Sequence, residues 1–136
     1  MATFLDTNVL VYAFDGSDER KRSIAQQILD DESIDIVVSS QVLSEFYWTV
    51  TRKLDPTLAE DVAHDVVRHL AEGEVVPIDG GLVDAAIGLA RRHRLALWDA
   101  AILVAASRAG CEEVLSEDLN DGEVIAGVRI RNPFEQ

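Results

Sequence analysis

Cysteine and histidine are scarce in this chain of 136 residues, and their scarcity excludes two kinds of site. Cys111 is the only cysteine, so no intrachain disulfide can form. The three histidines, His64, His69 and His93, stand singly, and the chain has no Cys/His spacing typical of a zinc site. We therefore expect the histidines to be surface or helix residues rather than ligands, and Cys111 to be a small buried residue before a strand.

Long hydrophobic runs are also missing. No apolar stretch approaches the roughly 18 residues that a membrane span requires. The apolar opening is short, ends at Asp6 and has no basic leader, which argues against a secretory signal. With 48% hydrophobic and 27% charged residues, residues 1–136 are expected to form one globular domain in the cytoplasm, without contact to a membrane.

Basic residues are few: 12 stand against 25 acids, which gives a formal net charge of −13. Broad affinity for nucleic acid normally depends on Lys and Arg, so this balance argues against it. It favours a basic protein partner, or a site in which a bound metal ion supplies the positive charge.

Predicted strands and helices alternate along the chain, which favours an α/β fold with a mostly parallel sheet. Short apolar runs predict the strands, and apolar residues at helical spacing predict the helices. Asp55-Pro56 is interpreted as a cap followed by a first-turn proline. The predicted strands span residues 3–5, 34–38, 75–78, 114–116 and 128–130, and the predicted helices span residues 17–29, 41–52, 56–70, 82–93 and 99–109.

Four carboxylates stand where strands or helices deliver them to one edge of this sheet. Asp6 and Asp118 follow strands, Glu45 lies in the helix after the second strand, and Asp99 opens the last helix. Ligands of open α/β sheets bind beyond the carboxyl ends of the strands. Acids gathered there need a cation between them, because like charges at short range cannot all stay ionised. The pattern predicts a Mg²⁺ or Mn²⁺ site, and such sites mostly handle phosphates.

Each acid also has a structural interpretation. Asp6 can be a turn or cap residue, Glu45 a solvated residue at the border of an apolar arc, and Asp99 an N-cap. Thr7 and Asn8 can hold the Asp6 carboxylate or an ordered water, or serve as turn formers. The joint placement of the acids, rather than any one of them, favours a functional site.

The stretch after the fourth predicted strand contains several candidate acids. Glu117, Asp118 and Asp121 all lie there, and the pattern does not decide among them. If the strand continues that far, its period of two places Ser116 and Asp118 on the same side.

Four motifs carry a family resemblance: Phe4-Leu5-Asp6-Thr7-Asn8-Val9-Leu10, Ser44-Glu45-Phe46, Leu97-Trp98-Asp99-Ala100, and Leu115-Ser116-Glu117-Asp118-Leu119-Asn120-Asp121-Gly122 followed by Val128 and Asn132-Pro133-Phe134. Because these motifs occur in this order and at this spacing, the chain resembles the PIN-domain ribonucleases, and among them the VapC toxins of toxin–antitoxin pairs. The match covers nearly the whole length. It implies a three-layer α/β/α fold with a short, mostly parallel central sheet.

The resemblance also assigns roles to residues. It implies that Asp6, Glu45 and Asp99 are the core acids of the metal site and that Asp118 is the fourth. It places Ser116 at the hydroxyl position two residues earlier, and Asp121 as a further participant.

The implied activity is Mg²⁺- or Mn²⁺-dependent hydrolysis of RNA phosphodiester bonds, with no histidine needed as a base. As a toxin, such a protein would cleave tRNA or ribosomal RNA and inhibit translation. The implied protein partners are a cognate antitoxin, which typically places a basic or bulky side chain in the acidic pocket, and a second copy of the chain in a homodimer.

Three other functions compete with this interpretation. A non-catalytic PIN-like module would keep the fold and act through protein contacts, and the full acid set argues against it. A receiver domain needs a lysine at a late strand end, and no lysine follows Lys53. A phosphatase of the haloacid dehalogenase type needs a second aspartate where Asn8 stands.

Overall fold

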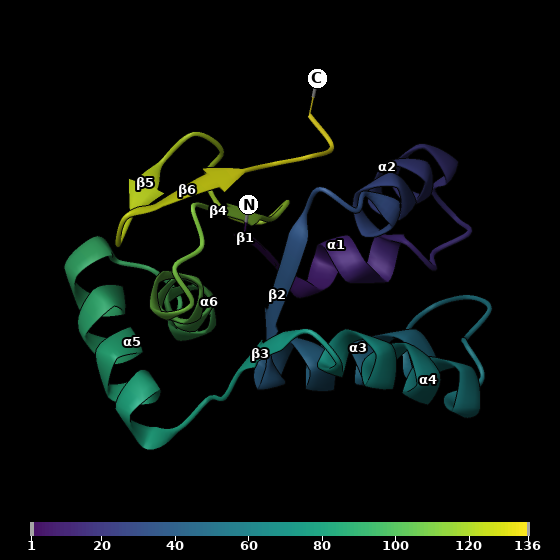
Figure 1. The fold of residues 1–136 in the computed structure, drawn as a ribbon, viewed down its shortest axis with the longest axis horizontal. Coiled ribbons are helices and arrows are strands. Elements are labelled where there is room, and N and C mark those ends of the chain that lie inside the picture. Colours follow the sequence, from purple (N-terminus) through teal and green to yellow (C-terminus); the bar gives the residue numbers. More distant parts are fainter. Residues whose placement is uncertain (1, 136) are drawn as a thin grey trace.

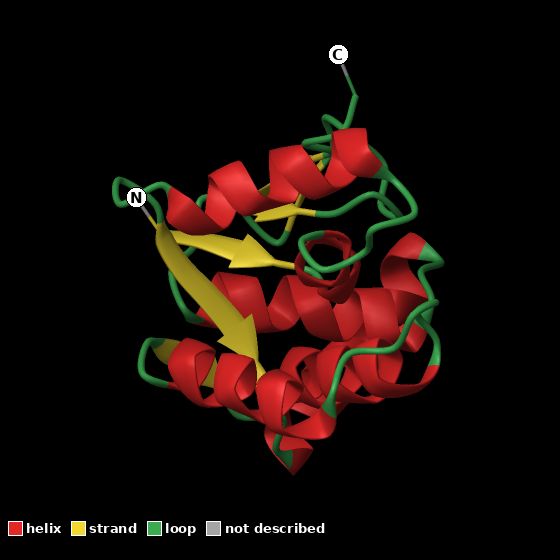
Figure 2. Ribbon diagram, turned by 90° about the vertical axis from the view of Figure 1, so that its right-hand side faces the viewer, coloured by secondary structure: helices red, strands yellow, loops and turns green. Residues whose placement is uncertain are grey.

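The computed structural model describes residues 2–135, in which a six-stranded sheet has helices on both faces (Figures 1 and 2). The strand order is β3-β2-β1-β4-β6-β5, and every pairing is parallel except that of β5 with β6. The predicted α/β fold with a mostly parallel sheet is therefore confirmed. The elements are β1 (Ala2–Leu5), α1 (Thr7–Tyr12), α2 (Glu19–Asp30), β2 (Asp35–Ser39), α3 (Ser40–Arg52), α4 (Glu60–Ala71), β3 (Glu74–Val76), α5 (Gly80–His93), α6 (Leu97–Arg108), β4 (Glu113–Leu115), β5 (Val124–Ile125) and β6 (Val128–Arg131).

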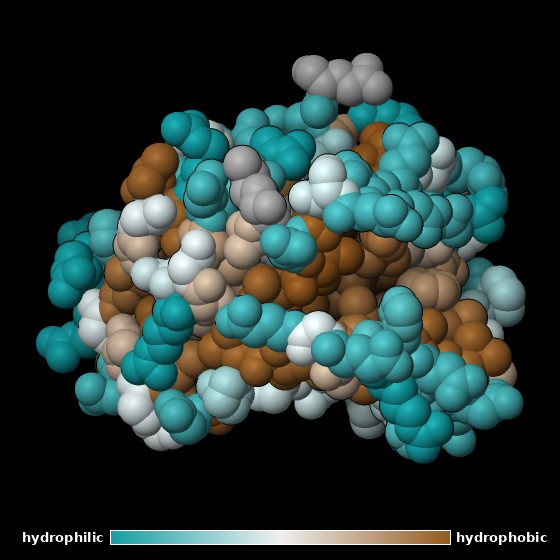
Figure 3. Space-filling model, viewed as in Figure 1, coloured by the Kyte–Doolittle hydropathy of each residue, from teal (hydrophilic) through white to brown (hydrophobic). Residues whose placement is uncertain are grey.

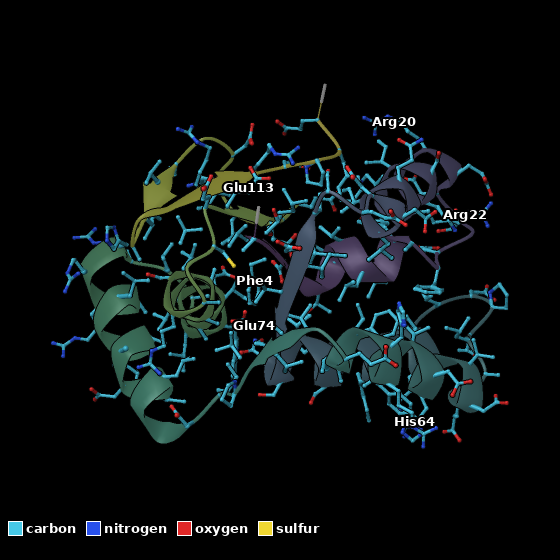
Figure 4. All side chains as sticks on the ribbon, in the orientation of Figure 1. Phe4, Arg20, Arg22, His64, Glu74 and Glu113 are labelled. Carbon is cyan, nitrogen blue, oxygen red and sulfur yellow. The ribbon has the colours of Figure 1, made fainter. Side chains whose placement is uncertain are left out.

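The first strand is the centre of the core. Phe4 and Leu5 of β1 are fully buried, and Figure 4 shows Phe4 in the interior while Arg20, Arg22 and His64 lie at the periphery. A strand covered on both faces needs apolar residues on both sides, which explains why the consecutive residues Phe4 and Leu5 are both apolar.

The middle of helix α6 is buried on all sides because it lies between the sheet and α5 (Figure 1). Every residue from position 100 to 106 is buried, and four of these seven are alanine, so α5 can approach closely. The helix ends at Arg108, and Gly110 follows shortly after as the predicted terminator, with a φ of +72°, the left-handed conformation that glycine adopts without strain.

The connections reverse direction beside β1. The chain first builds β2 and β3 on one side of β1, then returns through α5 and α6 to place β4 on the other side. At such a reversal the flanking helices leave on opposite faces of the sheet and open a crevice beyond the carboxyl ends of the strands. Here that crevice lies beyond β1 and β4.

Three predicted boundaries were wrong. The strand predicted at residues 75–78 ends at Val76, because Pro77 has no N–H to donate to a ladder. The helix predicted from Pro56 begins at Glu60 after the Ala59 N-cap; before it, the Leu58 N–H donates to the Val50 carbonyl at 2.8 Å. Asp99 is not an N-cap: α6 begins at Leu97, which leaves Asp99 in the first turn.

Two elements were not predicted. Helix α1 begins directly after β1, where the polar residues of positions 6–8 suggested only a turn. Its N-cap is Asp6, whose carboxylate accepts the Thr7 N–H at 2.7 Å. Strand β5 has only two residues, too few to show a period.

The expectations for scarce residues are confirmed. His64, His69 and His93 are exposed. Cys111 is buried before β4, and burial raises the pKa of its thiol to about 11. In the described part of the chain, no helix combines the length and the apolar character that crossing a bilayer requires.

Candidate active site

A small pocket of about 120 Å³ opens at the crevice beyond β1 and β4. It gathers side chains from four separate parts of the sequence: the start of α1, the first half of α3, the start of α6 and the loop after β4. All four predicted acids lie in its wall. The lining residues are Asp6, Thr7, Asn8, Gln41, Glu45, Trp98, Asp99, Ile102 and Asp118.

Asp6 is the most buried acid of the pocket, with 9% of its surface exposed. One carboxylate oxygen accepts the Thr7 N–H, and the other accepts the Ser116 hydroxyl at 2.7 Å. Burial raises the pKa of Asp6 to about 6, although the bonds from Ser116 and Thr7 lower it; the charges of Asp118 and Asp99 raise it further. The fold therefore holds Asp6 in a place where its negative charge is poorly compensated.

Asn8 and Ser116 tie Asp118 to Asp6. Asn8 Nδ2 lies 3.1 Å from Asp118 Oδ2 and 3.5 Å from Asp6 Oδ2. The Ser116 hydroxyl, which donates to Asp6, accepts the Asp118 N–H at 3.1 Å. Strand β4 ends at Leu115, so this hydrogen-bonded turn, and not the alternation of a strand, brings Ser116 and Asp118 together.

Glu45 is held at the opposite wall of the pocket. Its Oε1 accepts hydrogen bonds from Gln41 Nε2 at 2.9 Å and from Thr7 Oγ1 at 3.5 Å. Gln41 lies one turn before Glu45 on α3, so the two side chains share a face of the helix. Gln41 did not enter the sequence prediction, although its spacing of four residues from Glu45 was the available signal.

Asp99 completes the acidic wall from α6. Partial burial raises its pKa, and the charges of Asp118 and then Glu45 raise it further. The neighbouring acids thus contribute to the raised pKa values of Asp6 and Asp99, which indicates that the carboxylates lie within range of electrostatic repulsion.

The other two candidate acids after β4, Glu117 and Asp121, are absent from the lining found among the described residues. Glu117 accepts hydrogen bonds from Tyr12 and Lys21 on the far side of the loop. Asp121 Oδ1 accepts the Asn132 N–H at 2.8 Å, which fastens the loop to the chain after β6. Of the three alternatives that the sequence left open, Asp118 is the acid that faces the pocket.

The donor set of the pocket suits a hard divalent cation. Its acids offer only oxygen. A cation among them would offset the burial and the mutual repulsion that raise the pKa values of Asp6 and Asp99. Within residues 2–135, no three His, Cys, Asp or Glu side chains form a ready-made direct ligand set. Mg²⁺ keeps several of its waters and is commonly bound through one or two carboxylates, so this spacing fits its coordination.

Comparison with known families identifies the family to which this domain belongs. The family model of the PIN domain matches residues 3–124. The chain belongs to the PIN-domain family. The match reaches from β1 to β5, so it includes every residue of the pocket. A comparison with curated protein sequences finds no match.

Several solved structures share the fold. A toxin–antitoxin complex from Klebsiella pneumoniae has 22% identity and a TM-score of 0.71, with 98% of this chain and 99% of that chain covered. FitAcB from Neisseria gonorrhoeae has 20% identity and a TM-score of 0.67, with 98% and 99% covered. VapC20 of Mycobacterium tuberculosis, a toxin that cleaves the sarcin–ricin loop, has 17% identity and a TM-score of 0.66, with 85% and 91% covered.

Proposed function

We propose that this PIN domain is a metal-dependent endoribonuclease. The observation that carries the proposal is the meeting of Asp6, Glu45, Asp99 and Asp118 in one pocket at the reversal of the sheet. These acids come from elements up to 112 positions apart (6 to 118), so the fold, rather than local sequence, brings them together.

Each acid has a role in holding Mg²⁺ or Mn²⁺. Asp6 is the best-fixed ligand, because Thr7 and Ser116 orient both of its oxygens. Asp118, Glu45 and Asp99 complete the set, with some of them acting through water. The chemistry that a bound ion supplies is activation of water for attack on phosphorus and neutralisation of the charge that develops there.

The other polar residues position these ligands. Asn8 keeps Asp118 near Asp6, while Gln41 and Thr7 hold Glu45 toward the centre of the pocket. Asp121 supports the site indirectly, by closing the loop that carries Asp118.

RNA is the proposed substrate, and tRNA or ribosomal RNA the proposed target. One structural relative is described as cleaving the sarcin–ricin loop, a ribosomal RNA element. Without a metal ion, a pocket of four acids in a protein of charge −13 would repel any phosphate backbone. Cleavage should therefore depend strictly on the divalent ion.

The test is incubation of purified protein with total tRNA and ribosomal RNA, in Mg²⁺ or Mn²⁺ against EDTA. We expect discrete fragments that need the metal and disappear in Asp6→Asn and Asp99→Asn. Asp84→Asn is the matched control, because Asp84 is an exposed acid of α5 outside the pocket. Fragments that persist in all three variants would reveal a contaminating nuclease.

The competing function is a non-catalytic protein-binding module with a PIN fold. If folded wild-type protein binds Mn²⁺ but cleaves none of this RNA, the nuclease proposal fails. A biological effect that survives Asp6→Asn would then favour the binding module.

We also propose that the protein is the toxin of a toxin–antitoxin pair, because several structural relatives were solved as such complexes. A groove of about 980 Å³ between α2 and α4 offers a surface for an antitoxin. Figure 3 shows this hollow with apolar residues along its floor. Its apolar lining includes Leu29, Ile36, Val62, Val66 and Leu70.

The chemistry of the groove defines the segment that fits it. Acids stand among the apolar lining residues, including Asp30, Asp65 and Glu72. An amphipathic segment with apolar residues on one face and Lys or Arg at its margins would complement both features.

A homodimer is the remaining proposed assembly. Val83 and Ile87 stand one turn apart on the outer face of α5 and are 38% and 44% exposed, whereas Leu82, Ala86 and Leu89 form its buried face. Exposed apolar residues at this spacing suit packing against the same helix of a second copy.

A further inference from the structure

Trp98 is the most exposed large apolar side chain in the described part of the chain, with 66% of its surface accessible. A tryptophan side chain contributes most to the stability of a fold when it is buried, so this exposed ring contributes little to the free energy of folding. The residue nevertheless stands at the acidic pocket, because Trp98 lies in the first turn of α6 directly before Asp99 and lines that pocket.

The composition of the pocket wall makes this ring important. Among its nine lining residues are four acids and three polar side chains, but no Lys or Arg. Nucleic-acid sites usually gain affinity from cationic contacts to phosphates. Apart from a bound metal ion, the wall offers RNA one large attractive surface, and that surface is aromatic.

We propose that Trp98 is a stacking platform for an unpaired base of the RNA, next to the phosphate that is cleaved. This inference rests on the proposed nuclease function and names how the same site holds its substrate. Every base has a π-face, so stacking on tryptophan tolerates any sequence and replaces part of the missing cationic attraction. Because Trp98 and Asp99 are adjacent in one helical turn, a base on the ring is fixed relative to the acids.

A consequence is selectivity for unpaired nucleotides. A base in a duplex has both faces covered by its neighbours, so it must leave the stack before it can lie on Trp98. A loop or single strand should therefore be a much better substrate than the same sequence in a duplex.

Trp48, the other tryptophan, provides a matched comparison. It is 53% exposed on α3, three residues after Glu45, but it does not line the pocket. The guanidinium carbon of Arg52 lies 4.1 Å from its ring centroid, so a cation already covers that ring.

The first experiment measures steady-state cleavage of a short single-stranded RNA of mixed sequence, free and annealed to its complement. For Trp98→Leu we expect KM to rise by about 5-fold to 150-fold with kcat nearly unchanged, as for loss of one stacked base. Trp98→Phe should recover most of the affinity, because it keeps an aromatic face. Trp48→Leu should leave KM as it is, and circular dichroism should show folded protein in each case.

The second experiment reads stacking directly and does not need cleavage. In the Trp48→Phe variant, Trp98 is the sole tryptophan, and its fluorescence should be quenched when the RNA binds in Mg²⁺, recorded by stopped flow before turnover. Substrates with a single abasic nucleotide should identify one position at which quenching is lost. At that position, the abasic change and Trp98→Leu should not add in a double-mutant cycle, because both remove the same contact.

Three outcomes would overturn the inference. The first is cleavage by Trp98→Leu with wild-type KM, and the second is absence of quenching by RNA that binds. The third is a loss of self-association or antitoxin binding in Trp98→Leu with unchanged RNA affinity, which would assign the ring to a protein interface. Failure of the nuclease proposal is separate: the wild type would cleave no RNA, and the fluorescence titration would still decide whether Trp98 stacks on a base.

Discussion

The carboxyl group of Asp6 is buried among other acids, and this placement links its protonation to the stability of the fold. Its pKa is about 6 in the folded protein and has the ordinary value of 3.8 in the unfolded chain. Between these values the folded state binds more protons, so stability decreases as pH rises through the window. Above pH 6, this one group lowers the free energy of unfolding of the metal-free protein by about 3 kcal/mol.

Asp6→Asn should therefore stabilise the metal-free protein at neutral pH by up to about 3 kcal/mol while it abolishes cleavage. The gain should vanish below the ordinary pKa of aspartate, where the wild-type carboxyl is already protonated. Urea unfolding across this pH range in EDTA measures the effect. Saturating Mg²⁺ should narrow the difference, because the wild type alone gains stability from the ion. An equal gain at all pH values would show that the charge of Asp6 is not its origin.

Ser116 is the residue whose hydroxyl connects two acids of the site. Ser116→Ala removes a hydrogen bond that lowers the pKa of Asp6 and leaves the Asp118 N–H without its acceptor. We expect a loss of about 1–3 kcal/mol in stability, and a shift of Mn²⁺ binding to higher pH, since Asp6 deprotonates less readily. Calorimetric titration with Mn²⁺ at several pH values measures the shift. Ser44→Ala, which removes a hydroxyl contact to the Ser40 carbonyl outside the pocket, should leave the binding profile unchanged.

At the level of elements, α1 and α2 anchor the loop that carries Asp118. Lys21 of α2 pairs with Glu117, and Tyr12 of α1 donates to the same carboxylate at 2.7 Å. Burial raises the pKa of Glu117, but the bonds from Lys21 and Tyr12 outweigh it and leave the pKa lowered. The neighbour of Asp118 thus holds the loop in place without facing the pocket.

Breaking this anchor should reduce activity without changing any residue of the pocket. For Lys21→Met we expect a loss of about 1–2 kcal/mol in stability and a lower kcat, because Asp118 becomes less well positioned. Arg22→Met is the control: Arg22 pairs only with the exposed Glu19 among the interactions found for it, and its loss should change stability by less than about 1 kcal/mol. Thermal unfolding and steady-state cleavage together measure both effects. Equal behaviour of the two variants would contradict a role for the anchor.

For the whole molecule, the proposed RNA site, the proposed antitoxin groove and the proposed dimer face lie at three different places. The acidic pocket lies at the crevice beyond β1 and β4, the groove runs between α2 and α4, and Val83 and Ile87 lie on α5. A net charge of −13 would speed encounter with a basic antitoxin, and added salt should slow that encounter.

Two substitutions that introduce a negative charge should distinguish the antitoxin contact from the dimer contact. Val62→Glu, at a groove residue that is 45% exposed, should weaken antitoxin binding and leave the dimer intact. Ile87→Glu should give a monomer that still binds antitoxin. Neither residue touches the pocket, so metal affinity should be unchanged in both. Light scattering and pull-down with the antitoxin measure the two properties, and a variant that loses both would contradict separate surfaces.

Much of the fold was predictable because the sequence patterns that specify strands and helices are local. Apolar runs and helical spacing predicted the central strands and the long helices, and Gly110 predicted the end of α6. Errors arose where local signals are weak or conflict. Polar residues at positions 6–8 hid the short helix α1, and Asp99 resembles an N-cap although α6 begins two residues earlier.

The candidate site, like the fold, was predictable only in part from local sequence patterns. The candidate acids, the excess of negative charge and the family motifs were evident from the residues along the chain alone. The folded arrangement was needed to show that Asp118 and not Glu117 faces the pocket, that Gln41 holds Glu45, and that Trp98 stands exposed beside the acids. The reason is physical: element ends follow from patterns along the chain, whereas the direction of a side chain depends on contacts between elements far apart in sequence.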